Sequence, residues 1–391
     1  MHGFAQAGYA SRVTGLRPKD GADFILGEER LQLALAGSVP AGHGGFSAKA
    51  DLVHDGVANK ADVEVREAYL DFSAGPLEAR VGRQIVTWGT GDLLFVNDVF
   101  PKDWVALFAG RPLEYLKLGS DAIKLDWYIE DFGFEAVVSP FFEADRLPSP
   151  ERFFVLDPFP EVADRMTRRP RPNFENAESA LRVSRAVLGW ECALYAHRGF
   201  YRNPTTESDS MGASASVLMR FPRRGVYGAS AQRAGLGGVV SFEAGYYDSG
   251  DDPTGRDPVV PNSQALYLAG YRRQVGRSFT VGLQYYGERM LQYDRYRSGL
   301  PAGFPEQDRH RKLVSGRFTW LSNYQTWKLS FFGYWSPTDH DFYLIPEAWH
   351  SLADGVWVAM GANVFGGASG TTFFGQLDRN DNVYATLRYE F

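Results

Sequence analysis

Cysteine, histidine and methionine are scarce in this sequence, and their scarcity removes several classes of function. The 391 residues include one Cys, seven His and six Met. The single cysteine, Cys192, excludes an internal disulfide, a cysteine-based zinc site and an attached c-type haem. No two histidines stand four residues apart, and neither a G-x-S-x-G elbow nor a G-x-x-x-x-G-K-[ST] phosphate loop occurs. We therefore expect neither an enzyme nor a bound cofactor, and no metal site.

An excess of positive charge and a long apolar run are also missing. The sequence has 47 acidic and 41 basic residues, and its net charge of −6 excludes a generally basic surface for nucleic acid. No stretch approaches the roughly 18 consecutive apolar residues that suggest a transmembrane helix. No charged, apolar and small-residue leader opens the sequence, so we expect that a signal peptide has been removed.

Aromatic residues and glycine are plentiful, at 15% and 42 residues, and much of the chain alternates with a period of two. In 30–35, leucines alternate with Arg, Gln and Ala. In 123–129, Ile, Leu and Trp alternate with Lys, Asp and Tyr, and 382–391 repeats the pattern. Alternation over about ten residues is typical of a strand with one apolar and one polar face.

Segments of this kind recur along the whole chain and predict about 18 strands, an even number. The stretch 205–224 and the pair at 341–366 are the least regular, so 16 strands is the alternative. The predicted strands are 2–13, 24–36, 44–55, 62–73, 77–88, 119–129, 133–143, 178–187, 189–199, 226–234, 239–249, 264–273, 277–289, 312–321, 325–336, 341–350, 355–366 and 382–391.

Short turns and long polar loops connect these segments in alternation, as in a transmembrane β-barrel. A soluble β-sandwich also alternates, but it would place the many charges of the polar face outside, whereas a wide barrel can hold them in a wet lumen. The last residue, Phe391, ends an alternating apolar face and resembles the assembly signal of Gram-negative outer-membrane barrels. We therefore predict one all-β domain over 1–391, a transmembrane antiparallel β-barrel of about 16–18 strands.

The stretch that bears most on function begins in the strand at 77–88. Apolar residues alternate up to Val81, and strict alternation would place Arg83 on the same lipid-facing side. A lipid-facing Arg at the bilayer midplane costs about 2–4 kcal/mol. A bulge at Gly82 would turn Arg83 into the lumen, and the alternative is that Arg83 snorkels to the membrane interface. We predict the bulge.

A Gly-Arg pair late in the fifth strand resembles the general porins of Gram-negative bacteria. In those porins the arginine joins a basic cluster at the constriction, and the next loop folds inward and brings carboxylates to face it. The resemblance implies that Arg83 is a constriction residue and that the loop at about 89–118 folds into the barrel. It makes Asp92, Asp98, Asp103 and Glu114 candidates for the acidic side. The porins' Pro-Glu-Phe-Gly-Gly motif is absent, so which carboxylates face the pore is left open.

A closer resemblance rests on Gly82-Arg83-Gln84 followed by Trp88-Gly89. This G-R-Q-x-x-x-W-G pattern resembles a group of proteobacterial outer-membrane porin-like proteins that share it with alginate-export-type channels. The resemblance implies an outer-membrane channel and does not specify its solute.

Alternation alone places further charges of both signs on the lumen face. Mixed signs there allow a transverse field, although many of these residues could instead form salt bridges along the wall. The residues are Arg66, Arg80, Glu64, Lys124 and Asp126, with Arg30, Lys49, Asp51, Arg182, Glu191, Arg317 and Arg388.

These observations favour an outer-membrane porin for passive diffusion of small hydrophilic solutes, constricted by an inward loop. Two alternatives stay open: the sheath of a porin–cytochrome electron conduit, with a multihaem partner, and a substrate-specific export or uptake channel. A barrel-based enzyme would need a Ser/His/Asp grouping, and none stands out. We expect the lipid bilayer, lipopolysaccharide and small solutes as partners, leave a homotrimer open, and expect no nucleic acid.

Overall fold

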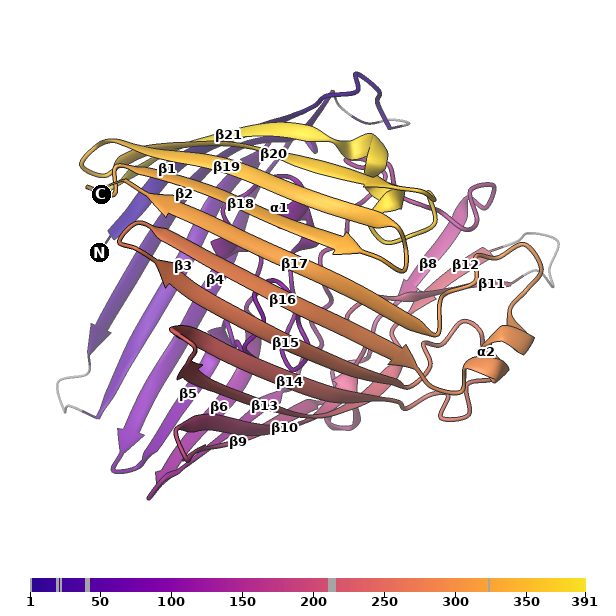
Figure 1. Cartoon of the computed structure of the whole chain (residues 1–391), viewed down its shortest axis with the longest axis horizontal. Helices are drawn as coiled ribbons and strands as arrows, with labels where there is room; N and C mark the ends of the chain where they lie inside the picture. The colour runs from indigo at the N-terminus through magenta and orange to yellow at the C-terminus, as the bar shows by residue number, and fades with distance from the viewer. Residues whose placement is uncertain (1, 19–20, 22, 39–42, 210–215, 323) are drawn as a thin grey trace.

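Eighteen antiparallel strands form one sheet, and pairing of the first strand with the last closes it into a barrel (Figure 1). The computed structural model describes residues 2–18, 21, 23–38, 43–209, 216–322 and 324–391. The barrel strands are β1 (His2–Arg12), β2 (Phe24–Ser38), β3 (Gly44–Asp55), β4 (Lys60–Ala74), β5 (Leu77–Gln84), β6 (Ser120–Ile129), β7 (Phe132–Ser139), β9 (Glu178–Val187), β10 (Trp190–Phe200), β13 (Arg223–Gly235), β14 (Gly238–Ser249), β15 (Gln264–Val275), β16 (Phe279–Met290), β17 (His310–Leu321), β18 (Trp327–Ser336), β19 (Asp341–Ala353), β20 (Val356–Gly367) and β21 (Asn382–Glu390). The predicted closed barrel is confirmed with 18 strands, whose ends differ from the predicted ones by at most four residues.

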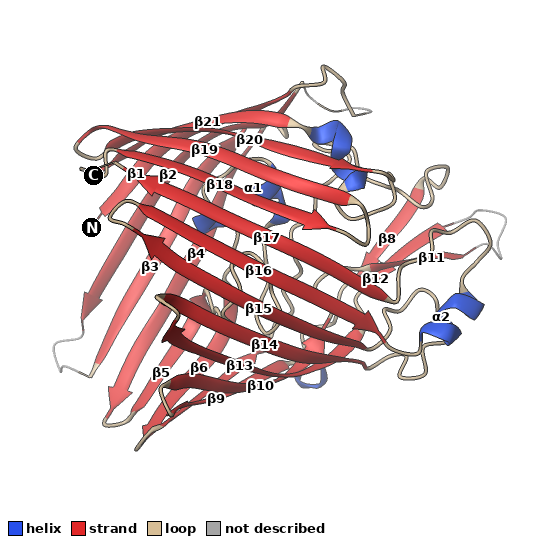
Figure 2. Cartoon of the chain, viewed as in Figure 1, coloured by secondary structure: helices blue, strands red, loops and turns tan. Residues whose placement is uncertain are grey.

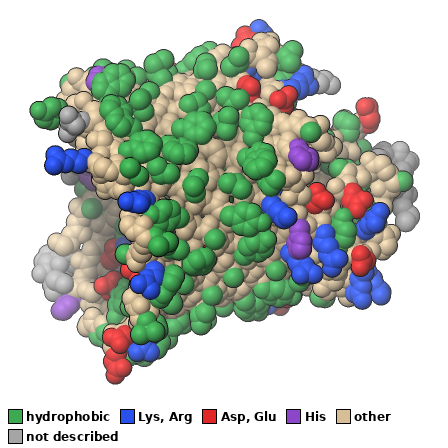
Figure 3. Space-filling model, viewed as in Figure 1, with side chains coloured by type: hydrophobic (Ala, Val, Ile, Leu, Met, Phe, Trp, Pro, Cys, Tyr) green, Lys and Arg blue, Asp and Glu red, His purple; other side chains and the backbone are tan. Residues whose placement is uncertain are grey.

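Burial along the strands is the reverse of that in a soluble protein. In β2, Leu33 and Leu35 are 41% and 45% exposed, while Gln32 and Ala34 on the opposite face are 8% and 5% exposed. Apolar side chains cover the outer face over β15 to β18, and charged side chains gather toward the end of the barrel that carries the long loops (Figure 3). An apolar outside and a polar inside are what a lipid-facing wall around an aqueous lumen requires.

A second, small sheet stands on the long-loop end of the barrel. It consists of β8 (Asp164–Arg168), β11 (Thr205–Asp209) and β12 (Ser216–Arg220), with β12 antiparallel to β11 and parallel to β8. The irregular stretch 205–224 thus contributes strands, but two of them lie outside the barrel, and its last residues begin β13.

The helical segments are short and lie in the loops (Figure 2). They are α1 (Trp104–Phe108), α2 (Tyr293–Gly299) and the 3-10 turns η1 (Leu113–Tyr115), η2 (Phe174–Asn176) and η3 (Gly375–Asn380). In the described part of the chain, no helix has the length and apolar character needed to cross a bilayer.

The predicted bulge at Gly82 is wrong. The pairing of β5 with β4 and with β6 runs without a shift through Gly82 and Arg83. The shift lies one strand away, between Lys49 and Ala50 of β3, where Arg66 of β4 is the extra residue. Gly82 has φ +128°, and a Cβ there would collide with the β4 backbone, so glycine serves a close approach of the two strands rather than a bulge.

Arg83 consequently keeps the register of Val81, on the outward row of β5. Its Nε donates to the Val65 carbonyl at 2.8 Å. Its Nη1 lies 3.6 Å from Asp121 and 3.8 Å from Glu143, near the long-loop end of these short strands. The guanidinium is thus neutralised locally on the wall, without the inward turn that the sequence suggested.

Candidate functional site

The segment between β5 and β6 is the candidate site. β5 ends at Gln84, whose side-chain amide donates to the Ala122 carbonyl of β6 at 3.0 Å, and the chain leaves the wall there. Apolar side chains from 86 to 118, among them Trp88, Val96 and Leu107, are buried against the inward faces of distant strands. Figure 1 shows α1 of this segment between the two walls of the barrel.

Glu243 of β14 fixes the first part of the segment. Its carboxylate accepts hydrogen bonds from the backbone N–H and the hydroxyl of Thr90, from Gly91 N at 2.8 Å and from Asn97 Nδ2 at 2.8 Å. The side chain is 4% exposed and has no cationic partner among the described residues. Several N–H donors around one buried carboxylate are a strong anchor, because hydrogen bonds to a charged acceptor are the stronger ones.

A pair of wall glycines makes room for this anchor. Gly228 of β13 and Gly245 of β14 are register partners on the inward row. A Cβ on Gly228 would collide with the Asn97 side chain, and one on Gly245 would lie 3.0 Å from Val96. The wall is therefore thinned where the segment reaches it.

Asp92 contacts a second part of the barrel wall, on β16 and β17. Its carboxylate accepts hydrogen bonds from Nε and from Nη2 of Arg317 on β17, the second at 2.8 Å. Gln284 of β16 accepts from Asp92 N at 2.7 Å and donates to Asp92 O at 2.8 Å. The predicted acidic residue and an arginine that alternation placed in the lumen therefore form a bidentate pair.

Glu114 contacts the wall near the closure of the barrel. Its carboxylate pairs with Arg388 of β21, which is 6% exposed, and its carbonyl accepts from Arg66 Nη2 at 2.6 Å. The neighbouring Tyr115 ring lies between two guanidinium groups, 4.4 Å from that of Arg66 and 4.4 Å from that of Arg30. Burial raises the pKa of the Tyr115 hydroxyl, so it stays protonated beside these cations.

Glu64 belongs to a chain of charges beside this contact. It lies 3.0 Å from Arg30 and 2.7 Å from Arg146, which comes from the next long loop. Arg30 is 3% exposed and also pairs with Glu28 at 2.9 Å. Arg111 of the segment lies 2.7 Å from Glu28. The segment therefore contributes a cation, Arg111, as well as the anion Glu114 to the charged groups of the wall.

Asp98 and Asp103 hold the segment together internally. Asp98 lies 3.3 Å from Lys102 and 2.8 Å from Lys117. Asp103 caps α1 by accepting from Ala106 N at 2.8 Å. Both carboxylates are at most 5% exposed, and burial lowers the pKa of Lys102. These two predicted residues are within the segment core, and the structure does not bring them together with Arg83.

Arg80, Lys124 and Asp126 lie on the inward row nearer the chain termini and pair along the wall. Arg80 pairs with Asp71 at 2.7 Å. Lys124 pairs with Asp126 at 2.9 Å. Their partners are on their own or adjacent strands, as the alternative interpretation of the lumen charges expects.

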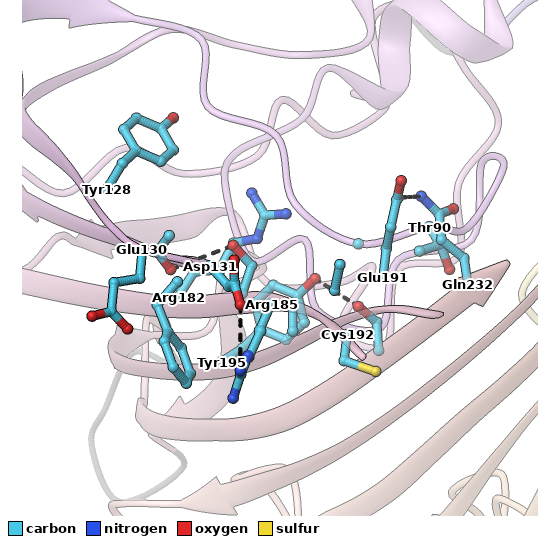
Figure 4. Close-up of a pocket in the computed structure, with 17 residues that line it drawn as sticks. Thr90, Tyr128, Glu130, Asp131, Arg182, Arg185, Glu191, Cys192, Tyr195 and Gln232 are labelled. Atoms are coloured by element: carbon cyan, nitrogen blue, oxygen red, sulfur yellow. Dashed lines mark hydrogen bonds and ion pairs between the residues drawn. The ribbon is translucent and has the colours of Figure 1, made fainter. Parts of the chain in front are cut away.

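A cavity of about 370 Å³ lies beside Thr90, lined by β7, β9, β10 and β13 (Figure 4). Its polar groups pair with one another: Gln232 donates to Glu191 at 2.6 Å, and the hydroxyls of Tyr195 and Ser230 are 2.8 Å apart. Among the described residues, no group of three or more His, Cys, Asp or Glu side chains is arranged to hold a metal ion.

Sequence reasoning missed Glu243, Gly228 and Gly245. Each lies on the polar face of an alternating strand, but alternation shows only the face and not the segment that packs against it. A glycine on an inward row is the one available signal, since it marks a place where another backbone can come close.

Comparison with solved structures finds the same barrel fold in other proteins. Pseudomonas aeruginosa OccK11 (OpdR) matches with a TM-score of 0.56 at 8% identity, covering 100% of this chain and 95% of that one. Pseudomonas aeruginosa OccD3 (OpdP) matches with a TM-score of 0.56 at 10% identity, covering 100% and 90%. A mutant of the Rh. blastica porin matches with a TM-score of 0.44 at 14% identity, covering 100% and 99%. At these identities the likeness is one of fold.

No curated protein matches the sequence. The model of one family, described as a protein of unknown function (DUF1302), matches residues 54–328, which is more than half of the chain. The chain therefore belongs to the DUF1302 family.

Proposed function

We propose that this protein is an outer-membrane channel for passive diffusion of small hydrophilic solutes, and that segment 89–118 narrows its lumen. The observation that carries the proposal is the set of bonds between this segment and inward side chains on β14, β17 and β21. A barrel of 18 strands is too wide to be filled by its own wall side chains. A solute that crosses it must therefore pass the segment.

The charges around the segment support a mildly selective passage. Asp92 and Glu114 face Arg317 and Arg388, on strands well separated around the wall. Paired charges that stay partly exposed, as Asp92 is at 45% of its side chain, create a local field without a large excess of either sign. Arg83 is left out of this constriction because it lies on the outward row.

The placement that we propose follows from the same features. The whole of 1–391 forms one barrel domain in the outer membrane of a Gram-negative bacterium, with the termini and short turns in the periplasm and the long loops outside. We further propose that the protein assembles as a homotrimer. Sedimentation in detergent tests the trimer, and a monomeric mass would rule it out.

Conductance in a planar bilayer tests the channel. Purified folded protein should add discrete current steps that vary linearly with voltage, because a water-filled lumen has no preferred direction at low field. The same preparation, heat-unfolded before addition, should add none. Folded protein that inserts without conductance would mean that segment 89–118 closes the lumen, and the proposal would be wrong.

A cytochrome sheath needs a lumen that can accept a partner protein. Segment 89–118 already reaches the wall at Glu243, Arg317 and Arg388, so its position favours a solute channel over a sheath. Absence of any haem absorbance in the native complex would agree with this.

The substrate-specific alternative has a specific observation in its favour, a cavity with apolar walls beside the segment.

A further inference from the structure

A cavity of about 320 Å³ lies between the segment and the inward faces of β13 to β18, and its walls are mainly apolar. Leu94, Phe95 and Trp104 contribute from the segment, and Leu266 and Leu313 contribute from the barrel. Such a volume and lining are those of a site for a small molecule rather than for a hydrated ion alone.

The cavity opens toward the long loops. It shares Glu288, Arg311 and Phe373 with a second hollow, of about 550 Å³, formed by the loops after β16, β18 and β20. A solute entering from that end therefore meets the cavity before it meets the anchor at Glu243.

Arg224 of β13 is the unusual group in this cavity. It is 8% exposed, its Nε has no hydrogen-bond partner, and its Nη2 makes only a long contact of 3.4 Å with the Val99 carbonyl. Its guanidinium lies 5.3 Å and 5.2 Å from the rings of Tyr201 and Tyr247. No carboxylate among the described residues forms an ion pair with it. A buried charge without a counter-ion is costly, so the site favours an incoming anion.

Arg202, in the same cavity, is an arginine whose hydrogen-bond donors and charge are paired. It is also 8% exposed, but it pairs with Glu178 at 2.7 Å and donates to the carbonyls of Val99 and Glu143 at 3.0 Å each. The contrast with Arg224 is therefore one of bonding and not of burial.

The other charges of the cavity are already compensated. Asp98 pairs with Lys102 and Lys117, and Asp145 accepts from Trp104 Nε1 at 2.9 Å. Glu288 accepts from the hydroxyl of Tyr286 and lies 3.8 Å from Arg311. Arg224 is thus left as the uncompensated charge.

Tyr201 adds a second free donor beside Arg224. Its hydroxyl is buried without a partner, and the side chain is 9% exposed. Burial raises the pKa of Tyr201 to about 12, so the hydroxyl keeps its proton and can donate.

We infer that this cavity is a binding subsite for a small organic acid, with the carboxylate on Arg224 and Tyr201 and a flat apolar body against Phe95, Trp104 and Leu266. This deepens the proposed function and rests on it, because it makes the passage one for amphipathic anions rather than for hydrophilic solutes in general. The binding itself does not require that the channel conduct.

Calorimetric titration of the detergent-solubilised protein at fixed ionic strength tests the subsite. The probes are benzoate, which has ring and charge, acetate, which has only the charge, and benzyl alcohol, which has only the ring. Benzoate should bind at least about tenfold more tightly than either of the others, since it alone meets both the donors and the apolar wall. Equal affinity for acetate and benzoate, or no benzoate binding, would overturn the inference.

Substitutions locate the binding. Arg224→Gln should weaken benzoate binding by about tenfold to a hundredfold, the range for losing a charge-assisted hydrogen bond, and leave benzyl alcohol unaffected. Tyr201→Phe keeps the ring and should weaken benzoate by about twofold to tenfold. Arg233→Gln, at the far end of the same strand and outside the cavity, should change nothing. If Arg224→Gln does not fold, unchanged benzoate affinity in Tyr201→Phe still overturns the assignment.

Conductance separates this inference from the proposed function. Benzoate binding without ionic current would leave the subsite standing and remove the channel. Current without benzoate binding would leave the channel standing and remove the subsite.

Discussion

At the scale of single residues, the direction of a side chain decides what an arginine does. Arg83 and Arg317 are both wall arginines with carboxylate partners. Arg83 lies on an outward row and is neutralised by wall and loop groups, whereas Arg317 lies on an inward row and holds Asp92 of the segment. A charge beside the lumen acts more strongly on passing ions than an outward one, because the Coulomb interaction weakens with distance.

Replacement of Arg317 should therefore alter ion selectivity. Arg317→Gln removes a lumen cation and frees Asp92, so the reversal potential in a KCl gradient should shift toward cation preference. Arg83→Gln is the matched control and should leave the reversal potential unchanged. Equal shifts in the two variants would contradict the assignment of rows to lumen and lipid.

Glu243 should determine how firmly the first part of the segment is held. Glu243→Gln exchanges charge-assisted hydrogen bonds for neutral ones, each weaker by about 1 kcal/mol, so amide protection over 89–97 should fall by at least about tenfold. Hydrogen exchange read by mass spectrometry measures this. Glu191→Gln is the control, since this inward carboxylate accepts a hydrogen bond from Gln232 and none from the segment among the described residues. Protection that falls equally in this variant would rule out a specific anchor.

At the scale of elements, the segment between β5 and β6 acts as a unit because its own core and its wall contacts are both satisfied. Trp88 packs edge-on to Phe100 at 5.1 Å between ring centres, and Trp104 stacks on Phe108 at 6.0 Å. Asp103 caps the short helix in the middle. Such internal packing lets a long loop keep one conformation without strand pairing.

A larger side chain at the glycine pair of β13 and β14 should displace the segment between β5 and β6 from the wall, while the barrel itself stays folded. Gly228→Leu introduces a side chain where Asn97 lies, and overpacking of this kind costs about 1–3 kcal/mol. Single-channel conductance should rise and become noisier as the segment leaves the wall. Gly235→Leu, at the end of the same strand, where a Cβ meets nothing within 4 Å, is the control. Identical current from Gly228→Leu and the native protein would show that the contact does not position the segment.

At the scale of the whole molecule, closure is what makes the wall stable in lipid. β1 pairs with β21 from Phe4–Glu390 to Arg12–Asn382, so no edge strand is left unpaired in the barrel. An unpaired edge in the hydrocarbon region costs several kcal/mol for each unsatisfied backbone group. The fold is therefore cooperative around the ring, although the sheet is built from local hairpins.

Removal of β21 should abolish the folded state rather than weaken it. A chain ending at residue 381 leaves two open edges, and we expect it to lose the heat-dependent shift on gels that folded barrels show. Deletion of 205–220, which carries two strands of the small outer sheet, should keep that shift. A folded barrel from the shorter chain would contradict the dependence on closure.

The sequence by itself determined the barrel, because a period of two and an apolar outer face are local properties that each strand carries alone. The 18 strand positions, the inward rows and the existence of a long loop after the fifth strand, predicted at about 89–118, all follow from that pattern. Alternation also placed Arg317 on the lumen face, and the resemblance to general porins made Asp92 and Glu114 candidates for the acidic side of the constriction.

Only the tertiary structure decided which of these residues meet. The pairing of Asp92 with Arg317 spans 225 positions, and that of Glu114 with Arg388 spans 274, so nothing local in the chain encodes either. The error at Gly82 has the same origin: the register shift that was predicted there lies one strand earlier, at Arg66. Register between neighbouring strands, and the space left by glycines on a far wall, are properties of the closed ring and arise only when it forms.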